Sequence, residues 1–203
     1  MWMEECRDLI CGMENAAKNM YRLRYQMSNG GNLSVRVPQQ ELMIVKKTDV
    51  AFDEVNRDNL VVTDFDGNVV EGTGKPSKEA LLHGAIYKAI PEAGAVMHCH
   101  SPFATAWAAH HDSLEFSTHH AALKFHGAVP VFDTHSYAVP KEYFPEIISF
   151  LKDHPQANAF LLRGHGQVTL ARDMRMAAYL AELMEETAEI SILAAAAARP
   201  AAN

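Results

Sequence analysis

Residues 95–102 read Ala-Val-Met-His-Cys-His-Ser-Pro, an apolar run that ends in two histidines one residue apart. The run predicts a short buried strand over 95–98. Side chains two residues apart on an extended backbone lie on the same face. We therefore expect His98 and His100 to point the same way, and Cys99 to pack in the core. Two imidazoles on one face at a strand end indicate a candidate metal site.

A third histidine follows another apolar run. His165 lies between Gly164 and Gly166, just after a strand predicted over 159–162. Glycine on either side lets the backbone turn sharply and bring the ring close to other groups. Three neutral histidines fit a catalytic zinc site whose fourth position stays open. The spacing alone leaves open that these histidines bind nothing, because His-x-His is short and often occurs by chance.

Residues 74–79, Gly-Lys-Pro-Ser-Lys-Glu, predict the start of a helix over 78–90, with Ser77 as its N-cap. Glu79 in the first turn would feel the positive end of the helix dipole and stay ionised. Near a metal it could act as a general base. A solvated first-turn glutamate is the simpler alternative, and sequence alone favours it. His83, one turn later, is expected to support the site or to pack in the core.

Two turns offer backbone N–H groups of the kind that bind anions. One contains Gly31 and Asn32, and the other contains Ser77 and Lys78. The cations and hydroxyl of 46–48, Lys-Lys-Thr, follow a predicted strand nearby in sequence. Ordinary turn chemistry also explains each of these patterns.

The remaining hydrophobic periodicities predict both helices and hairpins. They predict helices over 4–25, 103–110 and 174–198, and strands over 33–37, 42–45, 60–63, 68–71 and 168–170. This mixture predicts an α/β fold, a three-layer α/β/α arrangement with a mostly antiparallel central sheet.

Composition bounds the class of protein. The chain has 203 residues, 48% hydrophobic, with a formal net charge of −7. That suits one domain over 1–203 with a frayed tail over 199–203, and argues against nucleic-acid or membrane-surface partners. No apolar run reaches the roughly 18 residues that span a bilayer. The N-terminus does not resemble a signal peptide and the cysteines are few, so we expect a cytoplasmic protein.

Four motifs in order carry a resemblance over residues 5–195: Asn29-Gly30-Gly31-Asn32-Leu33-Ser34-Val35-Arg36, Lys75-Pro76-Ser77-Lys78-Glu79, His98-Cys99-His100-Ser101-Pro102 and Arg163-Gly164-His165-Gly166. Together they resemble the class II aldolase/adducin family, specifically its L-fuculose-1-phosphate aldolase-like members. The resemblance implies that Glu79 is the catalytic acid/base. It implies zinc ligands at His98, His100 and His165, although three histidines also accept Mn²⁺, Co²⁺ or Fe²⁺. It implies a phosphate site at Gly31, Asn32, Ser77 and Lys78.

The activity implied is reversible cleavage of a ketose 1-phosphate to dihydroxyacetone phosphate and an aldehyde, through a zinc-stabilised enediolate. The resemblance also implies a homotetramer with active sites at subunit borders. The sequence departs from the aldolase pattern at Lys78, where a second Ser is common, and at 46–49, where Thr-Pro-Thr-Gly is common. The neighbour-subunit tyrosine of aldolases has no clear match near residues 118–121.

Other reactions of the family stay open. Residues 101–108 look like those of pentulose-phosphate 4-epimerases, and 160–166 like those of methylthioribulose-1-phosphate dehydratases. Residues 75–79 appear in members that decarboxylate sugar-acid phosphates. A non-catalytic, adducin-like interaction module is a further alternative. Such modules can lose the metal ligands, whereas this chain keeps the three histidines and Glu79.

Overall fold

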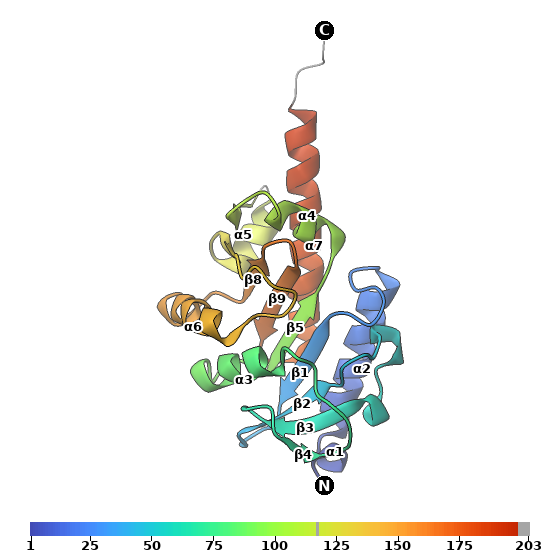
Figure 1. Ribbon diagram of the computed structural model, residues 1–203. Helices are drawn as coiled ribbons and strands as arrows, with labels where there is room; N and C mark the ends of the chain where they lie inside the picture. The colour runs from blue at the N-terminus through green and yellow to red at the C-terminus, as the bar shows by residue number, and fades with distance from the viewer. Residues whose placement is uncertain (117, 199–203) are drawn as a thin grey trace.

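The computed structural model describes residues 1–116 and 118–198. Its centre is a nine-stranded sheet with the order β4-β3-β2-β1-β5-β9-β8-β7-β6 (Figure 1). The strands are β1 (Asn32–Arg36), β2 (Leu42–Lys46), β3 (Leu60–Asp64), β4 (Val69–Glu71), β5 (Ala95–Cys99), β6 (Ser113–Leu114), β7 (Val129–Phe132), β8 (Ala159–Leu162) and β9 (Gly166–Ala171).

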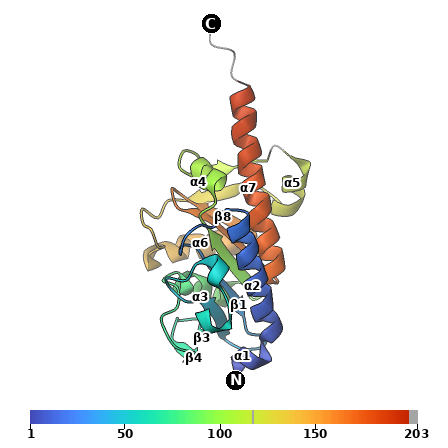
Figure 2. The same ribbon diagram turned by 90° about the vertical axis from the view of Figure 1, so that its right-hand side faces the viewer.

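Helices cover both faces of the sheet (Figures 1 and 2). They are α1 (Trp2–Glu5), α2 (Arg7–Arg22), α3 (Ala80–Ala89), α4 (Pro102–Ala108), α5 (His119–Phe125), α6 (Phe144–Asp153) and α7 (Met174–Ala197), with short 3-10 turns at Phe52–Glu54, Arg57–Asn59 and Lys141–Tyr143. Helices α2 and α7 pack on one face, and α3 and α6 pack on the other. Among these helices, none is both long and apolar enough to cross a membrane.

The sheet is mostly antiparallel, as predicted; β7 and β8 pair in parallel. Alternation along β5 sorts its side chains between the two faces. Met97 and Cys99 join the core beneath α2 and α7, whereas Val96 joins the core beneath α3 and α6. His98 lies opposite Asn32 of β1 in the register. This pairing brings the end of β5 next to the turn that precedes β1.

Two predicted helices begin or continue differently from the prediction. The N-terminal helix divides at Cys6 into α1 and α2. The predicted N-cap Ser77 lies outside α3, which has Glu79 at its N-cap position and begins at Ala80. The Ser77 N–H instead donates to the Lys46 carbonyl at 2.9 Å, which holds this segment beside the end of β2. The predicted frayed tail over 199–203 lies outside the described residues, and the single domain over 1–203 stays a prediction.

Candidate active site

Three histidines lie close together where the central strands β5, β8 and β9 end or begin. His98 is the last residue but one of β5, His100 directly follows this strand, and His165 lies in the turn between β8 and β9. One ring nitrogen from each lies within 4.8 Å of the others, an arrangement that could hold a metal ion. The ring centroids are 4.5–5.0 Å apart. His98 and His100 lie two residues apart at the end of β5 and face the same way, as expected. The turn between β8 and β9 supplies the third ring.

The hydrogen bonds of His98 fix which of its nitrogens faces the other rings. Its Nδ1 lies 2.9 Å from the Gln167 carbonyl oxygen, so the proton belongs on Nδ1 and Nε2 carries a free lone pair. That Nε2 lies 3.2 Å from Nε2 of His165. In the described chain, His165 Nδ1 is buried without a hydrogen-bond partner. Lone pairs converging on one point fit a divalent cation.

Burial also favours the neutral, metal-binding form of these rings. It lowers the pKa of His98 and of His100, and it lowers the pKa of His165 to about 4. Neighbouring histidines lower each pKa further, because two positive rings would repel one another. Neutral imidazoles near pH 7 can bind a metal without first releasing a proton.

Glu79 lies beside this cluster and is 6% exposed. Its Oε2 accepts a hydrogen bond from Asn32 Nδ2 at 2.7 Å and lies 3.5 Å from His98 Nε2. Its Oε1 is 3.4 Å from the backbone nitrogen of Val139. Burial raises the pKa of this carboxyl, but His98, His165 and Asn32 lower it by more, so the net pKa is below its ordinary value. Glu79 is therefore a buried carboxylate and not the solvated residue that sequence alone favoured.

A cavity of about 310 Å³ opens in front of these groups. All four residues predicted to bind phosphate line it, together with Glu79, His100 and His165. The other lining residues are Asn29, Gly30, Lys46, Thr48, Asp49, Tyr137 and Ala138. The cavity thus joins the histidine cluster to two turns that offer backbone N–H groups.

Lys46 is a residue of this cavity to which the sequence assigned no definite role. It is 1% exposed, and its Nζ donates to the Val50 carbonyl oxygen. Burial lowers its pKa to about 8. A buried cation at a cavity wall attracts an anionic group. The available signal was a lysine at the end of an apolar strand, on the same face as Ile44 two residues earlier, which is buried.

Gln26 connects the glycine turn to the histidine cluster, and sequence analysis missed it. Its side chain is buried, and its Oε1 accepts the His100 backbone N–H at 2.9 Å. An added Cβ on Gly31, whose φ is +62°, would lie 2.5 Å from that same oxygen. A glycine at this position therefore permits both the left-handed backbone and the contact with Gln26.

We expect Gly31→Ala to lower the free energy of unfolding by more than Gly164→Ala does. Both glycines have φ near +60°, so each alanine costs about 1–2 kcal/mol of backbone strain. Among the described residues, nothing lies within 4 Å of a Cβ added at Gly164, whereas Gln26 must move for the Cβ at Gly31. Chemical denaturation of the two variants measures the difference. Equal losses would contradict the steric role of Gln26.

His83 is buried in a separate polar network. Its Nδ1 lies 2.7 Å from Ser34 Oγ, which in turn lies 2.8 Å from the Tyr87 hydroxyl. Burial lowers its pKa to about 4. It lies behind Glu79 in the core on the α3 side of the sheet and is absent from the cavity lining given above.

Residues 11–192 match the family described as Class II Aldolase and Adducin N-terminal domain. The chain belongs to this family. Enzymes of this family are metal-dependent and act on phosphorylated sugars.

Individual relatives carry different activities. The chain is 42% identical to L-ribulose-5-phosphate 4-epimerase of Salmonella paratyphi B over 78 residues, which are 38% of this chain and only 34% of that relative. It is 31% identical to 3-oxo-tetronate 4-phosphate decarboxylase of Haemophilus influenzae, covering 88% of this chain and 84% of that one. It is 28% identical to L-fuculose phosphate aldolase of Methanococcus maripaludis, covering 86% and 90%.

The fold is also that of a solved aldolase. The structure of L-fuculose-1-phosphate aldolase from Thermus thermophilus matches with a TM-score of 0.82 at 22% identity, over 96% of this chain and 98% of that chain. At this identity the match establishes the shared fold alone.

Proposed function

We propose that this protein is a carbon–carbon lyase that cleaves a ketose 1-phosphate reversibly to dihydroxyacetone phosphate and an aldehyde. The observation that carries the proposal is the position of buried Glu79, 3.5 Å from the His98 ring and in the wall of one cavity with the anion-binding turns. A group that moves a proton, a metal-binding cluster and a phosphate site are the parts that this chemistry requires.

In this proposal His98, His100 and His165 hold a divalent metal, with Zn²⁺ as the first candidate. When bound, the metal supplies Lewis-acid stabilisation of negative charge on the substrate. The protein holds the His98 ring through the Gln167 carbonyl and the His100 backbone through Gln26. Such supporting hydrogen bonds keep ligands oriented before the metal arrives.

Glu79 is the proposed acid/base. As the carbon–carbon bond breaks, the hydroxyl proton of the departing carbon passes to solvent and that carbon leaves as the aldehyde. The electron pair of the bond stays on the dihydroxyacetone phosphate fragment as an enediolate, and Glu79 takes up a proton from solvent and delivers it to the enediolate carbon. In the synthetic direction it removes the same proton. The hydrogen bond from Asn32 fixes one carboxylate oxygen and the backbone N–H of Val139 approaches the other, so the carboxylate is oriented before substrate binds.

The phosphate is proposed to bind at Gly31, Asn32, Ser77 and Lys78. Supporting this, the segment that contains Ser77 is tied to the end of β2 by the Lys46 carbonyl, and Thr48 N–H donates to Lys75 O at 3.0 Å. These contacts hold the Ser77 turn at the end of β2, and the hydrogen bond from Asn32 to Glu79 joins it to the glycine turn. A fixed phosphate would hold the reacting carbons near Glu79.

Decarboxylation of a sugar-acid phosphate is the second candidate, and two cations of the cavity favour it. Lys46 and Lys78 both line the wall, and a substrate with a carboxylate as well as a phosphate would use both. Loss of CO₂ from 3-oxo-tetronate 4-phosphate leaves an electron pair on the adjacent carbon, and protonation of that carbon yields dihydroxyacetone phosphate. Both candidates therefore share one enediolate and one proton donor. The companion product, an aldehyde or CO₂, distinguishes them.

Ser77→Ala is expected to raise KM for the phosphorylated substrate about 10-fold, with a smaller change in kcat, because one hydrogen bond to a charged group is lost. Ser149→Ala, on α6, is the matched control and should leave KM unchanged. Steady-state kinetics measure both. A fall in kcat with unchanged KM would contradict a phosphate-binding role for Ser77.

The proposed assembly is a homotetramer with active sites at subunit borders. The C-terminal part of α7 extends beyond the sheet, and Leu193 there is 57% exposed (Figure 1). An exposed apolar helix end supports an interface in the assembled protein.

The 4-epimerase and dehydratase activities remain alternatives within the same family.

A further inference from the structure

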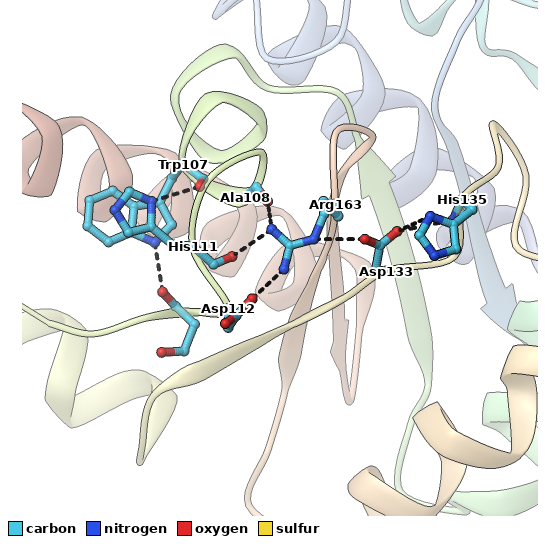
Figure 3. Close-up of polar contacts among 8 residues, drawn as sticks. Trp107, Ala108, His111, Asp112, Asp133, His135 and Arg163 are labelled. Atoms are coloured by element: carbon cyan, nitrogen blue, oxygen red, sulfur yellow. Dashed lines mark hydrogen bonds and ion pairs between the residues drawn. The ribbon is translucent and has the colours of Figure 1, made fainter.

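Arg163 directly follows β8, at the start of the turn that leads to β9, and its guanidinium contacts two separate segments of the chain (Figure 3). Nη1 donates to the carbonyl oxygens of Ala108, at 3.2 Å, and His111, at 3.4 Å, at the C-terminal end of α4. Nη2 pairs with Asp112, and Nε lies 3.0 Å from Asp133 Oδ2. Arg163 therefore connects α4 and the segment after β7 to the strand that leads into the histidine turn.

Asp133 is the first residue of the loop 133–139, and its carboxylate organises the start of that loop. Oδ2 faces Arg163, whereas Oδ1 accepts the backbone N–H of His135 at 3.2 Å and lies 3.0 Å from His135 Nδ1. Figure 3 shows this order, with Asp133 between the guanidinium and the imidazole. One carboxylate thus ties the loop backbone to Arg163.

The far end of the same loop reaches the candidate active site. Tyr137 and Ala138 line the cavity, and the Val139 backbone nitrogen lies 3.4 Å from Glu79 Oε1. Val139 is buried, whereas Tyr137 is 81% exposed. The loop is therefore held at its two ends, by Asp133 at the start and by the core at Val139.

We propose that Arg163 is a positioning residue that holds the loop 133–139 against the cavity through Asp133, and so keeps the Val139 N–H against Glu79. This inference rests on the proposed function for the role of Glu79. The order of the loop itself does not depend on which reaction the enzyme catalyses.

Arginine is required here because of its shape. Its planar fork presents five N–H donors, and in this protein they meet acceptors in two separate segments. A lysine ammonium is a single point charge and cannot span those acceptors. The two carboxylate partners also differ. Asp133 is 36% exposed, whereas Asp112 is 97% exposed, so the pair with Asp112 is screened and contributes little.

The test compares Asp133→Asn and Arg163→Lys with the matched control Asp112→Asn, all in metal-loaded protein. Hydrogen–deuterium exchange of residues 134–139 is expected to become about 10-fold faster in the first two variants and to stay unchanged in the control. Release of dihydroxyacetone phosphate should show kcat lowered about 10-fold and KM within about 2-fold, because the phosphate turns are untouched. Metal content should stay at the parental level.

Unchanged hydrogen–deuterium exchange of residues 134–139 in Asp133→Asn would overturn the proposal. The result for this variant is sufficient even if Arg163→Lys fails to fold. Faster exchange spread over β8 and β9 together with metal loss would indicate a general structural role and would also overturn it. Faster exchange of the loop with a parental kcat would overturn the claim that the loop acts on catalysis through Glu79. If the parent releases no dihydroxyacetone phosphate, the proposed function fails, and the exchange of 134–139 still decides whether Arg163 holds the loop.

Discussion

His98→Ala is expected to lose bound metal and activity together. With one of three imidazoles gone, two neutral ligands remain, and metal affinity should fall by more than the roughly 100-fold typical of losing a supporting contact. The buried position makes the loss severe, because His98 is 1% exposed and water cannot easily take its place. The measurement is metal per chain after dialysis at a fixed free-metal concentration, together with the rate of dihydroxyacetone phosphate release.

The matched control for this variant is His110→Ala, which removes an exposed imidazole outside the cluster. It should keep one metal per chain and full activity. His165→Ala should repeat the loss seen in His98→Ala, since His165 Nε2 faces His98 Nε2 at 3.2 Å. A His98→Ala protein that retains metal and turns over substrate would contradict the proposed ligand set.

Glu79→Gln is expected to keep the metal and to lose kcat by about 10²–10⁴-fold, the usual contribution of a general acid/base. The amide has nearly the same volume, and its oxygen can still accept the Asn32 hydrogen bond. It cannot deliver or accept the proton. Kinetics and metal analysis on one sample separate this result from that of His98→Ala.

Glu146→Gln, at an exposed position of α6, is the control for the Glu79 variant. It should behave as the parent does. Full activity in Glu79→Gln would remove Glu79 from the mechanism, whereas loss of metal would mean that Glu79 belongs to the metal site.

The histidine cluster could be predicted because strand alternation is a local property. His98 and His100 lie two residues apart, so one backbone conformation fixes their shared face and sends Cys99 to the opposite core. The general layout of helices and a mostly antiparallel sheet followed from similar local periodicities.

Long-range contacts determine the features of the site that could not be predicted from the sequence. Lys46 is buried because residues 75–77 lie against the end of β2, a contact made across some thirty residues of chain. The same contact moves the start of α3 beyond Ser77. Glu79 has the N-cap position but turns its carboxylate toward Asn32 and His98, so no side-chain cap forms.

The loop 133–139 was missed for a related reason. The segment from β6 to α6 is made of short elements, and the periodicity of a strand as short as β7 is too brief to recognise. The position of β7 depends on its parallel pairing with β8, and a parallel pair needs a long crossover that leaves no local signal. Tyr137 and Ala138 therefore reach the cavity because of the sheet topology, which could not be predicted from local sequence patterns.

The most direct test of this account is the release of dihydroxyacetone phosphate by metal-loaded protein. The substrates are a panel of ketose 1-phosphates together with 3-oxo-tetronate 4-phosphate. We expect release that stops on chelation and in Glu79→Gln, with an aldehyde as companion product for aldol cleavage or CO₂ for decarboxylation. No release from a protein that holds one metal per chain would contradict the account and favour the epimerase or dehydratase alternatives.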